Sequence, residues 1–158
     1  MSKSKFFHKL LESKNIFTIE QKAIVLCFVK NVAFFWDTRY IIYLVTCRAC
    51  GMQGVGHTTN FQSRISNYLS HICKRKPTCN TVRHFLETAN HSVEDFRIMG
   101  IVQLENPPKT AKKLKARLIE FEGYWQVKLQ TLEPYGLNSI NEFIGATGER
   151  NLMPTNDE

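Results

Sequence analysis

The sequence predicts an α+β fold, because segments typical of β-strands alternate along the chain with segments of helical periodicity. The chain has 158 residues, a length that suits one domain or one domain with a short appendage. An apolar fraction of 43% and a charged fraction of 22% are ordinary for a folded globular protein. We therefore expect one folded core rather than a disordered chain.

The first 37 residues are expected to form an N-terminal extension. Residues 4–14 place apolar side chains at helical spacing, which predicts a short amphipathic helix. Residues 23–36 are rich in Val, Ile and Phe, a composition that fits either a strand or a buried helix. The apolar run over 23–29 is far shorter than the roughly 20 residues of a membrane span. No cleavage signal follows the N-terminus, so we expect neither membrane insertion nor secretion.

Three segments are expected to be β-strands. Residues 40–46 (YIIYLVT) are β-branched and aromatic, which is the composition of a buried strand. A turn over 47–51 and a short strand over 52–56 would complete an antiparallel hairpin. Residues 96–104 alternate well enough to predict a third strand, which ends before two consecutive prolines.

Three further segments are expected to be helices. The first spans 60–74 and follows Thr58, Thr59 and Asn60, residue types that cap helix N-termini. A second runs near 79–88. The longest covers 110–132 and carries an apolar stripe at steps of four, three, four and four residues. This stripe consists of Leu114, Leu118, Phe121, Trp125 and Leu129.

The chain is basic, with 21 Lys and Arg residues against 14 Asp and Glu residues and a formal net charge of +7. This balance favours an anionic partner, either nucleic acid or an acidic membrane surface. Two clusters concentrate the positive charge. Such runs are commonly solvated surface, but they would also bind phosphates without sequence preference. The candidate DNA-binding residues are Lys74, Arg75, Lys76, Lys112, Lys113 and Lys115.

A Cys-x-x-Cys motif lies at the expected hairpin tip, at Cys47 and Cys50. Two thiolates at this spacing can reach one ion, and Gly51 relaxes the turn that brings the backbone close to sulfur. His84 and His91 follow in the sequence and would complete a Cys2His2 set suited to tetrahedral zinc. Spacing alone leaves two other interpretations open. The cysteines are small core residues beside surface histidines, or they form a redox dithiol.

Groups able to handle a phosphodiester occur on two of the expected helices. Arg64, Tyr68 and His71 share one helix face, where a guanidinium, a phenol and an imidazole could grip a phosphate and move a proton. Glu122 lies beside the apolar stripe of the longest helix and is a candidate Mg²⁺ ligand. The alternative interpretation is an exposed Arg, a half-buried Tyr and a Glu that points to solvent.

Taken together, these segments resemble the GIY-YIG endonuclease superfamily, and within it the endonuclease domain of Penelope-like retroelements. The resemblance covers residues 38–142 and leaves residues 143–158 as a polar C-terminal tail. The first motif is present as Ile41-Ile42-Tyr43 and the second as Gly54-Val55-Gly56. Single residues complete the pattern, namely Arg64, Glu122 in EGYW and Asn138 in TLEPYGLN.

This resemblance implies a small antiparallel three-stranded sheet flanked by helices, with an inserted Zn²⁺ site at the cysteine and histidine pairs. It also implies hydrolysis of one DNA strand with Mg²⁺ or Mn²⁺ as the catalytic ion. Tyr43 would orient the attacking water, Arg64 would stabilise charge on the phosphate and Glu122 would hold the ion. Asn138 would support the site by hydrogen bonds. DNA is the implied partner, with a reverse transcriptase domain or retroelement RNA beside it, and the nucleus is the implied location.

Two positions depart from the family pattern. Gly54 replaces the tyrosine of the second motif, so a phenol that would position water or substrate is missing. Tyr68 replaces the histidine that follows the arginine by four residues, and a phenol with an ordinary pKa of about 10 is a poorer base at neutral pH. We therefore expect slow cleavage, which Gly54→Tyr should raise. Two alternatives stay open: a catalytically inactive, zinc-containing DNA-binding module and a zinc-dependent protein-interaction module.

Overall fold

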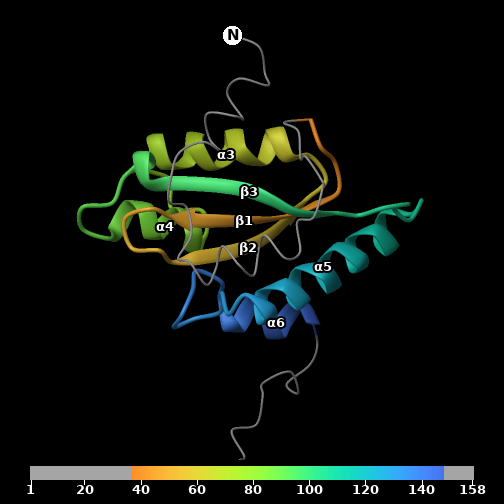
Figure 1. The fold of residues 1–158 in the computed structure, drawn as a ribbon. Helices are drawn as coiled ribbons and strands as arrows, with labels where there is room; N and C mark the ends of the chain where they lie inside the picture. Colours follow the sequence, from red (N-terminus) through yellow and green to blue (C-terminus); the bar gives the residue numbers. More distant parts are fainter. Residues whose placement is uncertain (1–36, 148–158) are drawn as a thin grey trace, which may run out of the picture.

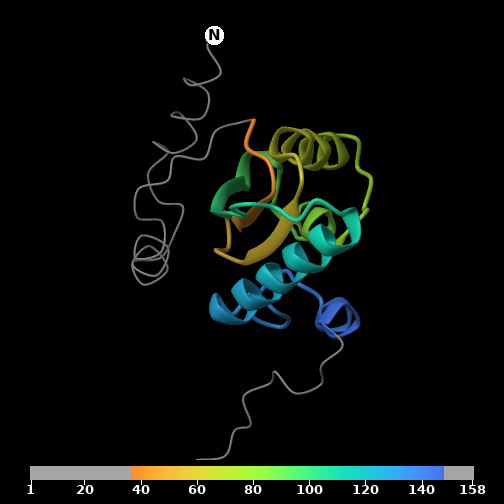
Figure 2. The same ribbon diagram turned by 90° about the vertical axis from the view of Figure 1, so that its right-hand side faces the viewer.

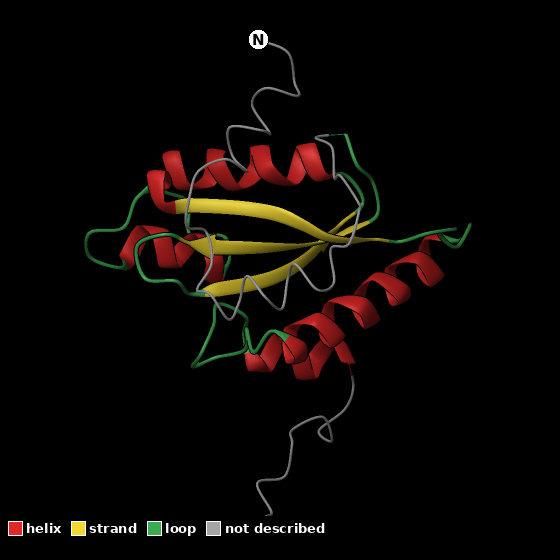
Figure 3. Ribbon diagram, in the orientation of Figure 1, coloured by secondary structure: helices red, strands yellow, loops and turns green. Residues whose placement is uncertain are grey.

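The computed structural model describes residues 37–147 of the chain. Three strands and four α-helices follow one another in this part, as Figures 1 and 3 show. The strands are β1 (Ile41–Cys47), β2 (Gln53–Thr58) and β3 (Phe96–Gln103), and the helices are α3 (Phe61–Cys73), α4 (Asn80–Glu87), α5 (Ala111–Lys128) and α6 (Ile140–Thr147). A short 3-10 turn, η1 (Val93–Asp95), leads into β3. The predicted segments over 4–14 and 23–36 lie outside the described residues.

The three strands form one antiparallel sheet in the order β2-β1-β3. β1 is the central strand and is buried along its whole length, as its apolar composition predicts. β2 runs two residues further than predicted, because His57 and Thr58 still pair with Ile42 and Ile41. The α+β class with a small three-stranded antiparallel sheet is therefore confirmed.

Helices cover both faces of the sheet, so the domain has three layers (Figures 1 and 2). Side chains alternate along β1, and one set packs on α3 and α4 while the other packs on α5. Ile41, Tyr43 and Val45 belong to the first core cluster. Ile42 and Leu44 belong to the second. Because the two cores share β1, any residue on β2 faces one core or the other according to its register.

The helix predictions agree with the structure to within a few residues at each end. Asn60 caps α3, since its side-chain oxygen accepts a hydrogen bond from the Ser63 N–H at 2.9 Å. The apolar stripe of α5 packs on the sheet through Leu118 and Trp125. α5 ends at Lys128, short of the predicted residue 132, and Gln130 beyond it adopts a left-handed backbone with φ of 53°. No helix between residues 37 and 147 combines the length and apolar character needed to cross a bilayer.

The segment after residue 138 differs from the prediction. A polar tail was expected from residue 143, but helix α6 begins at Ile140 and runs past that boundary to Thr147. Phe143 is buried, and α6 packs beside α5. The helix was missed because its apolar residues at helical spacing, Ile140, Phe143 and Ile144, cover little more than one turn.

Candidate metal centre and candidate active site

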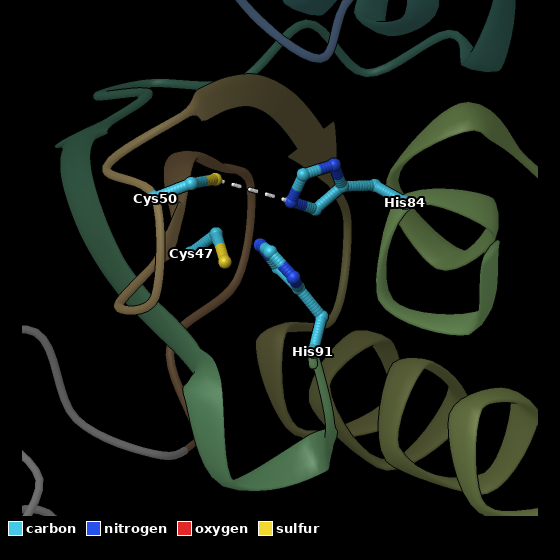
Figure 4. Close-up of side chains that lie close together, drawn as sticks. All are labelled: Cys47, Cys50, His84 and His91. Atoms are coloured by element: carbon cyan, nitrogen blue, oxygen red, sulfur yellow. Dashed lines mark hydrogen bonds between the residues drawn. The ribbon is translucent and has the colours of Figure 1, made fainter. Parts of the chain in front are cut away.

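Four side chains from three separate segments converge at one end of the sheet (Figure 4). Cys47 ends β1, Cys50 lies in the following turn, His84 lies in the last turn of α4 and His91 follows that helix. One ligand atom from each lies within 4.8 Å of the others. This Cys2His2 cluster could hold a metal ion such as zinc. The two histidines are therefore not independent surface residues.

The turn between the cysteines is built by backbone hydrogen bonds. The Cys47 N–H donates to the Met52 carbonyl at 2.9 Å, and the Gly51 N–H donates back to the Cys47 carbonyl at 2.8 Å. Gly51 has a φ of 79°, a left-handed conformation that glycine adopts without strain. The turn thus carries Cys50 back toward Cys47, as the motif predicts.

The two histidines direct the same ring nitrogen, Nε2, into the cluster. The Nδ1–H of His91 donates to the Ala89 carbonyl at 2.8 Å, and Nδ1 of His84 lies 3.3 Å from the Thr88 hydroxyl. Nε2 of His84 lies 3.4 Å from the Cys50 sulfur. Nε2 of His91 is buried and has no hydrogen-bond partner among the described residues. A fixed Nδ1 with a buried, unpartnered Nε2 is the arrangement of a metal-ligating histidine.

The pKa shifts in the cluster reflect burial and the mutual influence of its members. Burial raises the pKa of the Cys47 thiol to about 11. Burial also raises the pKa of Cys50, but the neighbouring His91 ring, the Met52 backbone and the Cys47 thiol lower it more, so the net shift is downward. Burial lowers the pKa of His84, and Cys50 raises that of His91. A bound cation would favour the thiolates and the neutral imidazoles that ligation requires.

The cluster does not include the other cysteines of the described part of the chain. Cys73 is exposed at the end of α3, and Cys79 precedes α4 and packs against the first core. Cys27 lies outside the described residues. The ligand set predicted from the sequence, Cys47, Cys50, His84 and His91, is thus the set that the structure brings together.

The second site centres on the phenol of Tyr43, which lies on β1 opposite Gly56 of β2. Tyr43 is 2% exposed, and its Oη lies 3.0 Å from the Oη of Tyr68 on α3. A Cβ atom at position 56 would overlap the Tyr43 ring. Gly56 of the second motif is therefore required for Tyr43 of the first motif to lie where it does.

Both phenols are protonated at neutral pH, and burial moves their pKa values further above the usual value. It raises the pKa of Tyr43 well above its usual value, and the adjacent Tyr68 raises it further. Burial is also the main cause of the raised pKa of Tyr68. The shifts make each phenol harder to ionise than a free tyrosine. Their chemistry is limited to donating and accepting hydrogen bonds.

Two charged groups act on the Tyr43 phenol from opposite faces of the sheet. Arg64 on α3 lowers the pKa of Tyr43, whereas Glu122 on α5 raises it. The Arg64 guanidinium lies 6.0 Å from the centre of the Tyr68 ring and forms no ion pair within residues 37–147. His71 does not join this group, because its Nδ1 lies 3.0 Å from the Thr78 hydroxyl.

Glu122 does not point freely into solvent. Its Oε2 pairs with Nδ1 of His57 on β2, and its Oε1 accepts a hydrogen bond from the Gln126 amide at 3.2 Å. Together with Asn138 and Glu142, these residues line a pocket of about 180 Å³ between β2, α5 and α6. Glu122 and Asn138, which were predicted as site residues, thus share one pocket.

Asn138 acts as a clamp on strand β2. Its Oδ1 accepts from the Val55 N–H at 2.8 Å and from the Thr131 hydroxyl at 2.7 Å, and its Nδ2 donates to the Val55 carbonyl at 2.8 Å. Val55 is the middle residue of the second motif. Asn138 therefore holds β2 in place by hydrogen bonds, to partners that were not evident in the sequence.

Gly54 is enclosed rather than open, which bears on the expectation for Gly54→Tyr. A Cβ atom there would lie 3.0 Å from the Leu137 Cβ and 3.7 Å from the Asn138 Oδ1. The substitution would displace Leu137, the residue next to Asn138. Gly54→Tyr is therefore not expected simply to restore the missing phenol. Leu137 is buried against the position that a tyrosine would need.

The two basic clusters are exposed but lie far apart on the domain. Lys74 caps the end of α3, and Arg75 and Lys76 follow it. Lys112, Lys113 and Lys115 lie in the first half of α5. In Figure 1 the end of α3 and the start of α5 are at opposite ends of the sheet.

Sequence reasoning missed two partners at this site, His57 and Gln126. Spacing in the sequence indicates the side of the element on which each residue lies, but not the contact between β2 and α5. His57 follows Val55 by two residues, so both face α5 from the same side of β2. Gln126 follows Glu122 by one helical turn.

Comparison of the chain with protein-family models, with curated proteins and with solved structures gives no match. We therefore infer a function from the motifs and from the chemistry of the two sites.

Proposed function

We propose that the chain is a divalent-metal-dependent endonuclease of the GIY-YIG type that nicks one strand of DNA. The observation that carries the proposal is the pocket that Glu122 shares with Asn138, whose side chain is hydrogen-bonded to Val55 of the second motif. A cation such as Arg64, a carboxylate such as Glu122 and a hydroxyl such as that of Tyr43 are groups that phosphodiester hydrolysis uses. These are also the residues on which the family resemblance depends.

Glu122 would hold the catalytic ion. Glu142 lines the same pocket, so the acidic residues there offer carboxylate oxygens, which suit Mg²⁺ and Mn²⁺. When bound, the ion would supply charge stabilisation for the phosphate and the leaving oxygen. Arg64 would grip the scissile phosphate, because it is half-buried and makes no ion pair with the described carboxylates.

The Cys2His2 cluster would hold zinc in a structural role. Four protein ligands close a tetrahedral site and leave no position for water or substrate. The buried, unpartnered Nε2 of His91 supports this assignment, since a metal ion would complete its coordination. Zinc there would tie the turn after β1 to the end of α4.

DNA would be bound mainly through phosphates. The exposed lysines and arginines of the two clusters would release counterions, so affinity should fall steeply with salt and depend little on sequence. We expect a loss of at least tenfold between roughly 50 and 200 mM salt, and an unchanged affinity would contradict this mode of binding. In a retroelement setting the nick would supply a primer end in the nucleus, with a reverse transcriptase domain or retroelement RNA as further partners.

A catalytically inactive, zinc-containing DNA-binding module of the same fold is the second candidate. Gly54 carries no phenol, and Leu137 packs where one would lie. The Tyr68 phenol is buried and bonded to Tyr43, so it does not replace the basic histidine of the family. Both candidates predict zinc and DNA binding, and only the first predicts turnover. A protein-interaction module would instead show no DNA affinity at low salt.

Nicking of supercoiled plasmid with Mg²⁺ or Mn²⁺ tests the proposal. Glu122→Gln should abolish conversion to open circles while DNA affinity stays nearly unchanged, because the substitution removes a charge and keeps the volume. Glu120→Gln is the matched control, since Glu120 is exposed two residues earlier on the same helix. Arg64→Ala should slow nicking by roughly 10²–10³, a typical cost of losing one group that stabilises developing charge.

Two outcomes would contradict the endonuclease. If wild type and Glu122→Gln nick equally, the activity comes from contamination. If the wild type binds DNA and never nicks it with either ion, the binding module is the correct function.

A further inference from the structure

One interaction at the candidate active site has no counterpart in the motifs, the pair between His57 and Glu122. His57 belongs to β2 and Glu122 to α5, and their side chains are 28% and 20% exposed. A carboxylate oxygen only accepts hydrogen bonds, so Nδ1 of His57 carries the hydrogen that faces Oε2. The imidazole is thereby fixed with Nδ1 toward the carboxylate.

The carboxylate is held from two sides. His57 contacts Oε2, and the Gln126 amide donates to Oε1 at 3.2 Å. Gln126 is 7% exposed and therefore has little freedom to move. Each carboxylate oxygen has further lone pairs, so both contacts leave acceptor capacity for an ion in the pocket.

The position of His57 is set by the strand that carries it. Asn138 clamps both backbone groups of Val55 two residues earlier, and His57 pairs with Ile42 in the sheet. Val55 and His57 face α5 from the same side of β2. The clamp on Val55 thus fixes the register that brings His57 to Glu122.

The other described histidines make contacts outside the candidate active site. His71 contacts Thr78, while His84 and His91 belong to the Cys2His2 cluster. Within residues 37–147, His57 is therefore the imidazole available to the candidate active site.

We propose that His57 is a positioning residue, which orients the Glu122 carboxylate through its Nδ1–H for binding a divalent ion. This inference rests on the proposed function, because it assigns Glu122 the role of ion ligand. Hydrogen bonds to a ligating carboxylate are known to tune metal sites, and their loss typically costs 10–100-fold in metal affinity or activity.

Three substitutions at His57 separate this role from others. Asn places an amide N–H near the position of Nδ1, Gln places one near Nε2, and Ala places none. If Nδ1–H is what matters, His57→Asn should stay within a few fold of wild type. His57→Gln and His57→Ala should then need about 10–100-fold more Mn²⁺ for half-maximal nicking, with little change in the rate at saturating Mn²⁺.

A second measurement does not depend on nicking. The affinity of the zinc-loaded protein for Mn²⁺, followed by water proton relaxation, should fall in His57→Ala and His57→Gln and persist in His57→Asn. Glu122→Gln should lose it altogether. Urea unfolding of each variant shows whether the fold is retained, and His57→Asn is the variant expected to be closest to wild type.

Loss of Mn²⁺ affinity in His57→Ala with rescue in His57→Asn supports the positioning role, even if the wild type never nicks DNA and the proposed function fails. Equal Mn²⁺ affinity in wild type and His57→Ala overturns the role. An Asn variant as impaired as the Ala variant also overturns it, because the imidazole would then act through Nε2.

Discussion

Replacing Asn138 with alanine should destabilise the domain more than an exposed polar substitution can. The side chain makes three hydrogen bonds, two to the backbone of Val55 and one to the Thr131 hydroxyl, all between 2.7 and 2.8 Å. A net contribution of about 1 kcal/mol for each bond gives a loss of roughly 3 kcal/mol. Val55 is buried, so its N–H and carbonyl would not regain full hydration.

Thr131→Val is the matched control, since it keeps the shape and removes one of these three bonds. It should cost about 1 kcal/mol. Urea unfolding followed by circular dichroism measures both variants. With an m-value of about 1–3 kcal/mol/M, the Asn138→Ala midpoint should fall by roughly 1–3 M. A loss below about 1 kcal/mol for Asn138→Ala would refute the clamp and leave Asn138 with no structural role.

Three further predictions follow from the two sites. Burial raises the pKa of Tyr43, so the free energy of unfolding should hold steady below about pH 10 and fall above it. Tyr43→Phe should reduce this fall, and a variant with the same alkaline profile as wild type would contradict the burial of Tyr43. His91→Ala should lower both the zinc content and the melting temperature. Cys73→Ser should change neither, because Cys73 is exposed and outside the cluster. Equal zinc content in the two variants would contradict the site. Gly56→Ala should lower the free energy of unfolding by about 1–3 kcal/mol because its Cβ overlaps Tyr43, while Gly145→Ala in open space should raise it by up to about 1 kcal/mol. Denaturant titrations in which both variants shift stability in the same direction would exclude this packing.

Local patterns were sufficient to predict most of the fold. The apolar stripe of α5 identified Leu118 and Trp125 as core residues, because helical periodicity reports which face is buried. The composition of β1 likewise predicted a strand buried on both faces. α6 was not predicted this way, since Ile140, Phe143 and Ile144 span only about one turn and give too short a periodic pattern.

The metal cluster was predictable from spacing and family resemblance, but the surroundings of the candidate active site were not. His57 meets Glu122 only because β2 is paired in one register, and a shift of one residue would turn His57 to the opposite face. The clamp of Asn138 on Val55 joins residues far apart in sequence. Neither contact leaves a periodic signal, so both needed the fold.

The chemistry of the nick tests the central claim most directly. Supercoiled plasmid incubated with the protein and Mn²⁺ is repurified, and a DNA polymerase with labelled nucleotides is added. Hydrolysis that leaves a 3′-hydroxyl predicts label incorporated into open circles made by the wild type and none with Glu122→Gln. Plasmid that stays supercoiled, or open circles that accept no label, would contradict an endonuclease that supplies a primer end.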